Sequence, residues 1–67
     1  MSIQVECYSG HRADERPLRF CLDARWVEIK RVVRQWREPD AELFEVEIAG
    51  GGCYRLRHRR LGHWTLD

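Results

Sequence analysis

The chain has 67 residues, of which 43% are hydrophobic and 34% charged, and its formal net charge is +1. A chain of this length buries roughly 60% of its unfolded surface, and its three Trp, two Tyr and two Phe are enough for one compact core. This composition argues against disorder, and no apolar run approaches the ~20 residues that a spanning helix needs. We therefore expect a single small domain over residues 1–67, with no membrane segment.

The number and spacing of the cysteines bear on the cellular compartment of the protein. Cys7, Cys21 and Cys53 are an odd number without close spacing, and no secretory signal is visible. Such a set fits reduced thiols, so the sequence predicts a cytoplasmic protein.

The first two strands are predicted from alternating hydrophobicity. Residues 2–8 alternate, and after a polar loop at residues 9–16 a second alternating run begins at Pro17. The residues expected to point inward are Ile3, Val5, Cys7, Leu18, Phe20 and Leu22. Pairing Val5 with Phe20 sets Glu6 opposite Arg19.

Residues 24–38 fit two structures. Apolar residues at positions 26, 29, 33 and 36 have helical spacing, with Asp23 as a cap and Pro39 as a stop. As a strand, a turn at Asp23-Ala24 would pair Phe20 with Val27 and Leu18 with Ile29, and would set Arg19 opposite Glu28. Asp-Ala is a poor two-residue turn, and the alternation breaks near Arg31, so a β-bulge is needed there. We favour the strand, and the helix stays open.

The last third predicts a β-hairpin around Gly50-Gly51-Gly52. Alternation favours three apolar pairs: Ile48 with Tyr54, Val46 with Leu56, and Phe44 with His58. This register sets Glu47 opposite Arg55 and Glu45 opposite Arg57.

A final strand at residues 63–66 follows a turn at residues 59–62. It would pair Leu56 with Trp64 and Tyr54 with Leu66. The fold expected is all-β: an antiparallel meander of five or six strands that closes into an SH3-like or OB-like barrel or roll.

With these strands placed, the chain resembles a set of short bacterial all-β proteins of unknown function. The resemblance spans residues 16–66. It is carried by Arg16-Pro17-Leu18-Arg19-Phe20, Trp26-Val27-Glu28-Ile29, Val32-Val33, Trp36-Arg37-Glu38-Pro39, Phe44-Glu45-Val46, Tyr54-Arg55-Leu56-Arg57-His58 and Trp64-Thr65-Leu66. It implies a small bacterial cytoplasmic protein with no assigned activity.

The residues that could carry chemistry lack the spacing that chemistry needs. A zinc site would have to use Cys7, Cys21, Cys53, His11, His58 and His63, which contain no closely spaced Cys pair. A Cys21 nucleophile has no identified base, and a small barrel has little room for a substrate pocket. The glycines join two strands rather than opening a helix, so they do not predict a phosphate loop. We expect no metal, no cofactor and no catalytic site.

Two binding functions remain. The first is a protein-binding or adaptor module whose outward Trp26 pairs with Cys21 inside a rim of Tyr8, Arg19 and Glu28, a composition typical of binding hot spots. The partner is unknown, and the chain would be a monomer or a weak homodimer that meets through an exposed edge strand.

The alternative is a module for single-stranded nucleic acid that uses a loop tip of Arg59, Arg60 and His63. Pairing of Arg55 and Arg57 with glutamates would limit this basic patch to the tip.

Overall fold

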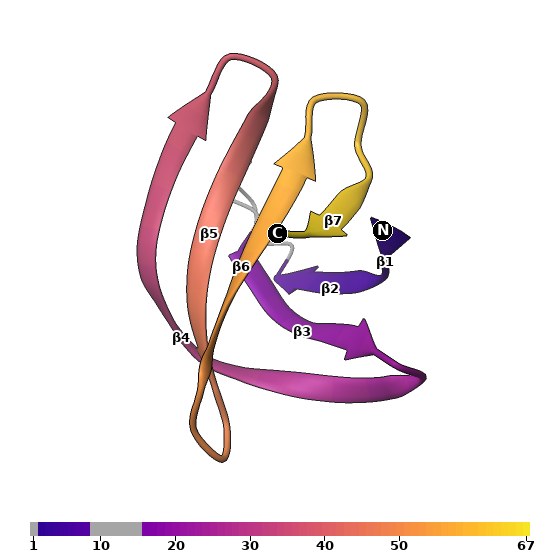
Figure 1. The fold of residues 1–67 in the computed structure, drawn as a ribbon, viewed down its shortest axis with the longest axis vertical. Coiled ribbons are helices and arrows are strands. Elements are labelled where there is room, and N and C mark those ends of the chain that lie inside the picture. Colours follow the sequence, from indigo (N-terminus) through magenta and orange to yellow (C-terminus); the bar gives the residue numbers. More distant parts are fainter. Residues whose placement is uncertain (1, 9–15) are drawn as a thin grey trace.

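The structure, a computed structural model, describes residues 2–8 and 16–67 as an antiparallel β-sheet (Figure 1). The seven strands are β1 (Ser2–Ile3), β2 (Val5–Tyr8), β3 (Arg16–Leu22), β4 (Arg25–Glu38), β5 (Ala41–Ile48), β6 (Cys53–Arg59) and β7 (Trp64–Leu66). His11 and most of the loop predicted at residues 9–16 lie outside the described residues. The predicted all-β class is confirmed.

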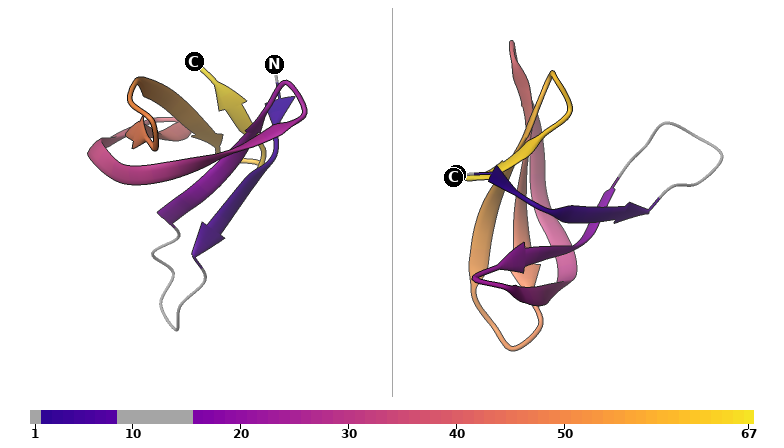
Figure 2. Two further views of the ribbon diagram at one scale, coloured as in Figure 1. Left: turned by 90° about the horizontal axis from the view of Figure 1, so that it is seen from below. Right: turned by 90° about the vertical axis from the view of Figure 1, so that its right-hand side faces the viewer.

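The sheet curls into a half-barrel (Figure 2). Its order is β1-β7-β6-β5-β4-β3-β2, so the first segment of the chain pairs with β7 through β1 and with β3 through β2. Between these two strands the carbonyl oxygen of Gln4 accepts a 2.9 Å hydrogen bond from the Cys21 amide. The expected five or six strands become seven because the run at residues 2–8 is interrupted at Gln4.

The core lies on the concave face of this sheet. Phe20, Phe44, Val46, Leu56 and Trp64 form a buried cluster. The ring of Phe20 meets Tyr54 edge-on at a centroid distance of 5.5 Å, and Phe44 lies 5.4 Å from Trp64. These contacts join β3 to β6 and β5 to β7, so the core forms only when the sheet curls.

Residues 25–38 are a strand and not a helix, which confirms the favoured prediction. The pairing of β4 with β5 shifts by one residue between Ile29 and Arg31 and again between Val32 and Arg34. The predicted bulge near Arg31 is therefore present, with a second bulge at Val33. Each extra residue reverses the alternation, so Ile29 and Val32 both pack against the core while Val33 is exposed.

The turn at Asp23-Ala24 forms as predicted, and it fixes the register of β3 and β4. Arg19 faces Glu28, Phe20 faces Val27 and Cys21 faces Trp26. The predicted pair of Leu18 with Ile29 does not form, because the pairing of these strands ends at Arg19 and Glu28.

Leu18 was expected inward, and this prediction is wrong. The pairing of β2 with β3 begins as predicted, with Val5 opposite Phe20, but a register shift after Glu6 places Cys7 opposite Pro17. Pro17 is buried in place of Leu18, which is 43% exposed. The bulge exchanged the faces of these two neighbours.

The predicted registers of the last two hairpins are wrong by two residues. Val46 faces Tyr54 and Phe44 faces Leu56 across β5 and β6, while Leu56 faces Leu66 across β6 and β7. The Ile48 amide donates to the Gly52 carbonyl over 3.0 Å, so the loop shifts by one residue from 50–52 to 49–51. A two-residue slip leaves every side chain on its face, so alternation alone could not detect it.

The Asp23-Ala24 turn generates a stability prediction. Asp23 has a φ of 50° and Ala24 a φ of 64°, a left-handed conformation that costs L-residues other than Gly roughly 1–2 kcal/mol. Gly also favours the unfolded chain by roughly 0.5–1 kcal/mol. We therefore expect Ala24→Gly to raise the free energy of unfolding by up to about 1 kcal/mol, measured by denaturant titration.

Gly50→Ala is the matched reverse change. Gly50 has a φ of 94°, and a Cβ added there meets no atom within 4 Å, so only backbone strain opposes it. We expect the free energy of unfolding of this variant to be lower than that of the wild type by about 1 kcal/mol. A destabilised Ala24→Gly protein would show that the turn has a different conformation.

Candidate functional site

Trp26 stands on the convex outer face of the β3–β4 hairpin. The tight turn at residues 23 and 24 sets it directly opposite Cys21, and alternation places both away from the core. The Trp26 side chain is 48% exposed and Cys21 is half-buried beside it. The predicted outward pair is therefore present.

A row of charges crosses the same face next to this pair. Glu6, Arg19 and Glu28 face one another on β2, β3 and β4, as predicted. The Nε atom of Arg19 lies 3.2 Å from a Glu6 oxygen and 3.7 Å from a Glu28 oxygen, and it makes no hydrogen bond with the described residues. Exposed pairs of this kind contribute at most about 1 kcal/mol, so the row mainly fixes register.

Tyr8 does not join this surface. It faces Arg16 at the other end of β3 from Cys21, and it is 54% exposed. Cys21 lies five positions after Arg16 on β3, which is roughly 17 Å along a strand. The structure brings together Arg19, Cys21, Trp26 and Glu28, and the charged row separates Tyr8 from the Cys21–Trp26 pair.

The predicted basic tip is partly neutralised. Arg59 closes its loop with a 2.8 Å hydrogen bond from its amide to the His63 carbonyl, and its guanidinium lies 3.3 Å from a carboxylate oxygen of Asp40. The Arg60 amide donates to the Asp40 carbonyl over 2.9 Å. Arg60 and His63 remain exposed, so the tip offers fewer unpaired cations than predicted.

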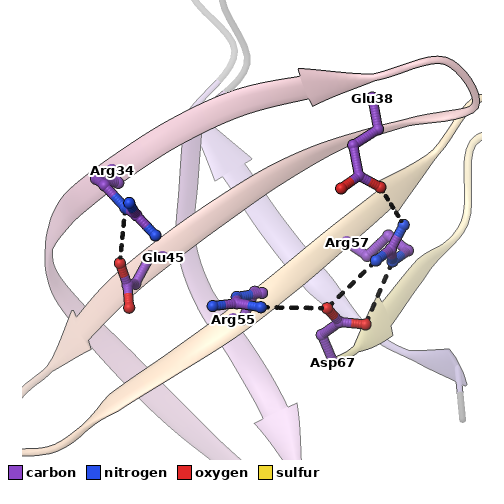
Figure 3. A network of polar contacts seen from close by, with 6 residues as sticks. All are labelled: Arg34, Glu38, Glu45, Arg55, Arg57 and Asp67. Atoms are coloured by element: carbon purple, nitrogen blue, oxygen red, sulfur yellow. Dashed lines mark hydrogen bonds and ion pairs between the residues drawn. The ribbon is translucent and has the colours of Figure 1, made fainter.

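A second outer-face cluster contains Trp36, which the sequence reasoning did not select. Figure 3 shows charged residues of this cluster, among them Arg34, Arg55, Arg57 and Asp67. Leu43 is buried on this face, between Trp36 of β4 and Arg57 of β6. The guanidiniums of Arg34 and Arg55 lie 4.9 Å and 5.3 Å from the Trp36 ring centroid, within range of cation–π attraction. The pairing of residues 34–38 with residues 41–45 has no bulge, so a two-residue turn at Pro39-Asp40 is the signal that would have placed Trp36 opposite Leu43.

The charge pairs predicted for Arg55 and Arg57 are replaced by others in this cluster. Arg57 lies 2.9 Å from Glu38 and 3.3 Å from Asp67, and Arg55 lies 4.0 Å from Asp67. Hydrogen bonds to Asp67 and then to Glu38 raise the pKa of Arg57 above its ordinary value. Both arginines are thus in structural pairs as expected, with different partners.

The glutamates of β5 pair with β4 instead of β6. Arg34 lies 3.1 Å from Glu45, and Arg31 lies 2.6 Å from Glu47. The hydrogen bond from Arg31 holds the pKa of Glu47 below its ordinary value of 4.5. Because β5 has a basic strand on each side, charge complementarity could not choose between the two neighbours.

The other residues considered for chemistry are dispersed. Cys7 packs against the core, Cys53 is exposed at the start of β6, and His58 stacks on Trp64 at 4.2 Å with the rings parallel within 1°. Among the described residues, no group of three or more His, Cys, Asp or Glu is placed to hold a metal ion.

Comparison with family models, with curated proteins and with solved structures finds no match. The resemblance to short bacterial all-β proteins therefore stays a prediction. Within residues 2–8 and 16–67, no helix has the length and apolar character needed to cross a membrane.

The Arg31–Glu47 pair generates a pH prediction. Because the pKa of Glu47 is lower in the folded chain, its stabilising contribution is complete at neutral pH and is lost as the pH falls from 4.5 through the folded-state pKa. We expect Glu47→Gln to make the melting temperature less dependent on pH between about 5 and 3, measured by circular dichroism.

Arg31→Gln is the control, because it removes the hydrogen bond that causes the shift. It should flatten the same part of the profile, and the double variant should add nothing further. A Glu47→Gln profile parallel to that of the wild type would contradict this assignment.

Proposed function

We propose that this protein is a small protein-binding module that docks on its partner through Trp26. The observation that carries the proposal is the difference in solvent exposure among the three tryptophans. Trp64 is buried in the core and Trp36 is half-buried beside two arginines, whereas Trp26 is 48% exposed. A large aromatic side chain left open beside a charged rim is the usual composition of a binding hot spot.

We propose further that the module is non-catalytic and cytoplasmic. Cys21 is the best placed nucleophile, but it faces Trp26, while His58 stacks on Trp64 and His63 lies in the β6–β7 loop. A nucleophilic thiol needs a base within hydrogen-bond reach. Cys21 and Cys53 are free thiols, as is usual in a reducing compartment.

The charges favour a protein partner over single-stranded nucleic acid. Binders of nucleic acid present a stripe of cations and stacking aromatics. In this sheet Arg55, Arg57 and Arg59 are ion-paired, and the stacked Trp64 ring is buried. At the tip of the β6–β7 loop this leaves Arg60 and His63, which make a small footprint.

Trp26→Ala tests the proposal. Truncation of a hot-spot Trp costs about 2 kcal/mol or more, so the variant should bind the partner at least about 30-fold more weakly. Its thermal stability should change little, because the side chain is on the surface. The measurement is quantitative co-purification from the source cells under native conditions, followed by titration with the identified partner.

Leu61→Ala is the matched control, because Leu61 is 90% exposed in the β6–β7 loop. This variant should retain the partner. Unaltered binding by Trp26→Ala, or its unfolding, would contradict the proposal. Loss of the captured partner after nuclease treatment, with dependence on Arg60, would favour the nucleic-acid alternative instead.

A further inference from the structure

The structure leaves one long strand edge open. β4 pairs with β3 only from Arg25 to Glu28, and from Ile29 onward it pairs with β5 on its other side. Figure 1 shows β4 bending away from β3 after this point. In the described residues, no strand covers the β3-facing edge of β4 at residues 30–38. An unpaired edge of this kind can accept an extended segment of another chain.

A hollow lies where the two strands separate. It has a volume of about 260 Å³, and its apolar lining comes from Tyr8, Pro17 and Leu18 on one side and from Ile29 and Val32 on the other. This volume is below the ~300 Å³ at which small-molecule sites begin, so it suits a single side chain of a larger partner. Tyr8 and Leu18 are 54% and 43% exposed here, so the wall is accessible.

The rim of the hollow is basic. Its charged lining residues are Arg16, Lys30 and Arg31. Arg31 is already paired with Glu47, but neither Arg16 nor Lys30 forms an ion pair with any described residue. Further along the edge, Arg34 and Arg37 are exposed but ion-paired, Arg34 with Glu45 at 3.1 Å and Arg37 with Glu42 at 3.6 Å, so the unpaired cations are those of Arg16 and Lys30. Like charges would oppose the pairing of this edge with a second copy, whereas carboxylates would be attracted.

We propose that the gap between β3 and β4 binds an extended acidic peptide segment of a partner protein. One apolar side chain of the peptide enters the hollow, and acidic residues on either side of it meet Lys30 and Arg16. The peptide backbone lies along the open edge of β4 from residue 30. This site goes beyond the Trp26 contact, because the Glu6–Arg19–Glu28 row separates the two surfaces.

The test uses fluorescein-labelled heptapeptides in which Asp or Glu alternates with apolar residues and the central residue is Leu, Ile, Val or Phe. Two control sets replace the apolar residues with Ser or the acids with Lys. Fluorescence anisotropy of the full chain should show binding of the acidic–apolar set alone. Amide chemical shifts should then change at Arg16, at Leu18 and at residues 29–33.

Lys30→Glu should weaken binding at least about tenfold, because it places like charge against the peptide. Lys30→Ala provides a second variant that removes the charge without reversing it. Trp26→Ala is the matched control and should bind the peptide as the wild type does. If Trp26→Ala also leaves the partner bound, the proposed function fails while the peptide site stands.

Three results would overturn the inference. The first is no binding by any acidic–apolar peptide at low salt. The second is equal binding by the Ser set, which would show that charge alone is responsible. The third is a wild-type dimer that Lys30→Glu alters, which would make the occupant of the edge a second copy.

Discussion

Two extra residues in β4 determine how this sheet closes. With Lys30 and Val33 inserted relative to β5, the strand keeps Val27, Ile29 and Val32 on the core side while its pairing passes from β3 to β5. A regular strand of this length would turn part of that apolar set toward solvent. Bulges also increase local twist, and the resulting curl lets Phe20 of β3 reach Tyr54 of β6. The core therefore depends on an irregularity in its longest strand.

Ion pairs select the register of the hairpins, which the hydrophobic pattern leaves open. A slip of two residues preserves both faces of a hairpin, so the glutamates of β5 could have met arginines on either neighbour. They pair with Arg31 and Arg34 of β4, and this releases Arg55 and Arg57 to contact Asp67. The same arginines flank Trp36 and Leu43, so the ion pairs and the outer apolar cluster share side chains. Such pairs contribute little energy singly, and their value lies in fixing one register.

Sequence reasoning reached the fold class, the strand at residues 25–38 and the part of the first two hairpin registers around Arg19 and Phe20, because each followed from local alternation and one charged row. It failed where the structure depends on how one strand pairs with another rather than on the pattern within a single strand. The face of Leu18 depended on a bulge against β2, and the last two registers depended on which neighbour each charge preferred. For the candidate site, the Cys21–Trp26 pair followed from a turn only two residues away. Tyr8 was wrongly assigned to the rim, because the predicted pairing of Val5 with Phe20 already places it near Pro17, at the other end of β3 from Cys21.

The change of partner along β4 completes the core and also leaves an open strand edge and a hollow on the surface. By turning from β3 toward β5, β4 buries its apolar residues but leaves an edge without a partner and a hollow beside Leu18. An open edge in a small sheet invites uncontrolled association, and the unpaired cations of Arg16 and Lys30 beside the hollow oppose association with a like copy. Those cations do not oppose an acidic segment. The same charges that protect the edge from self-pairing thus define which partner it can accept, and protection and selectivity become one property of the strand.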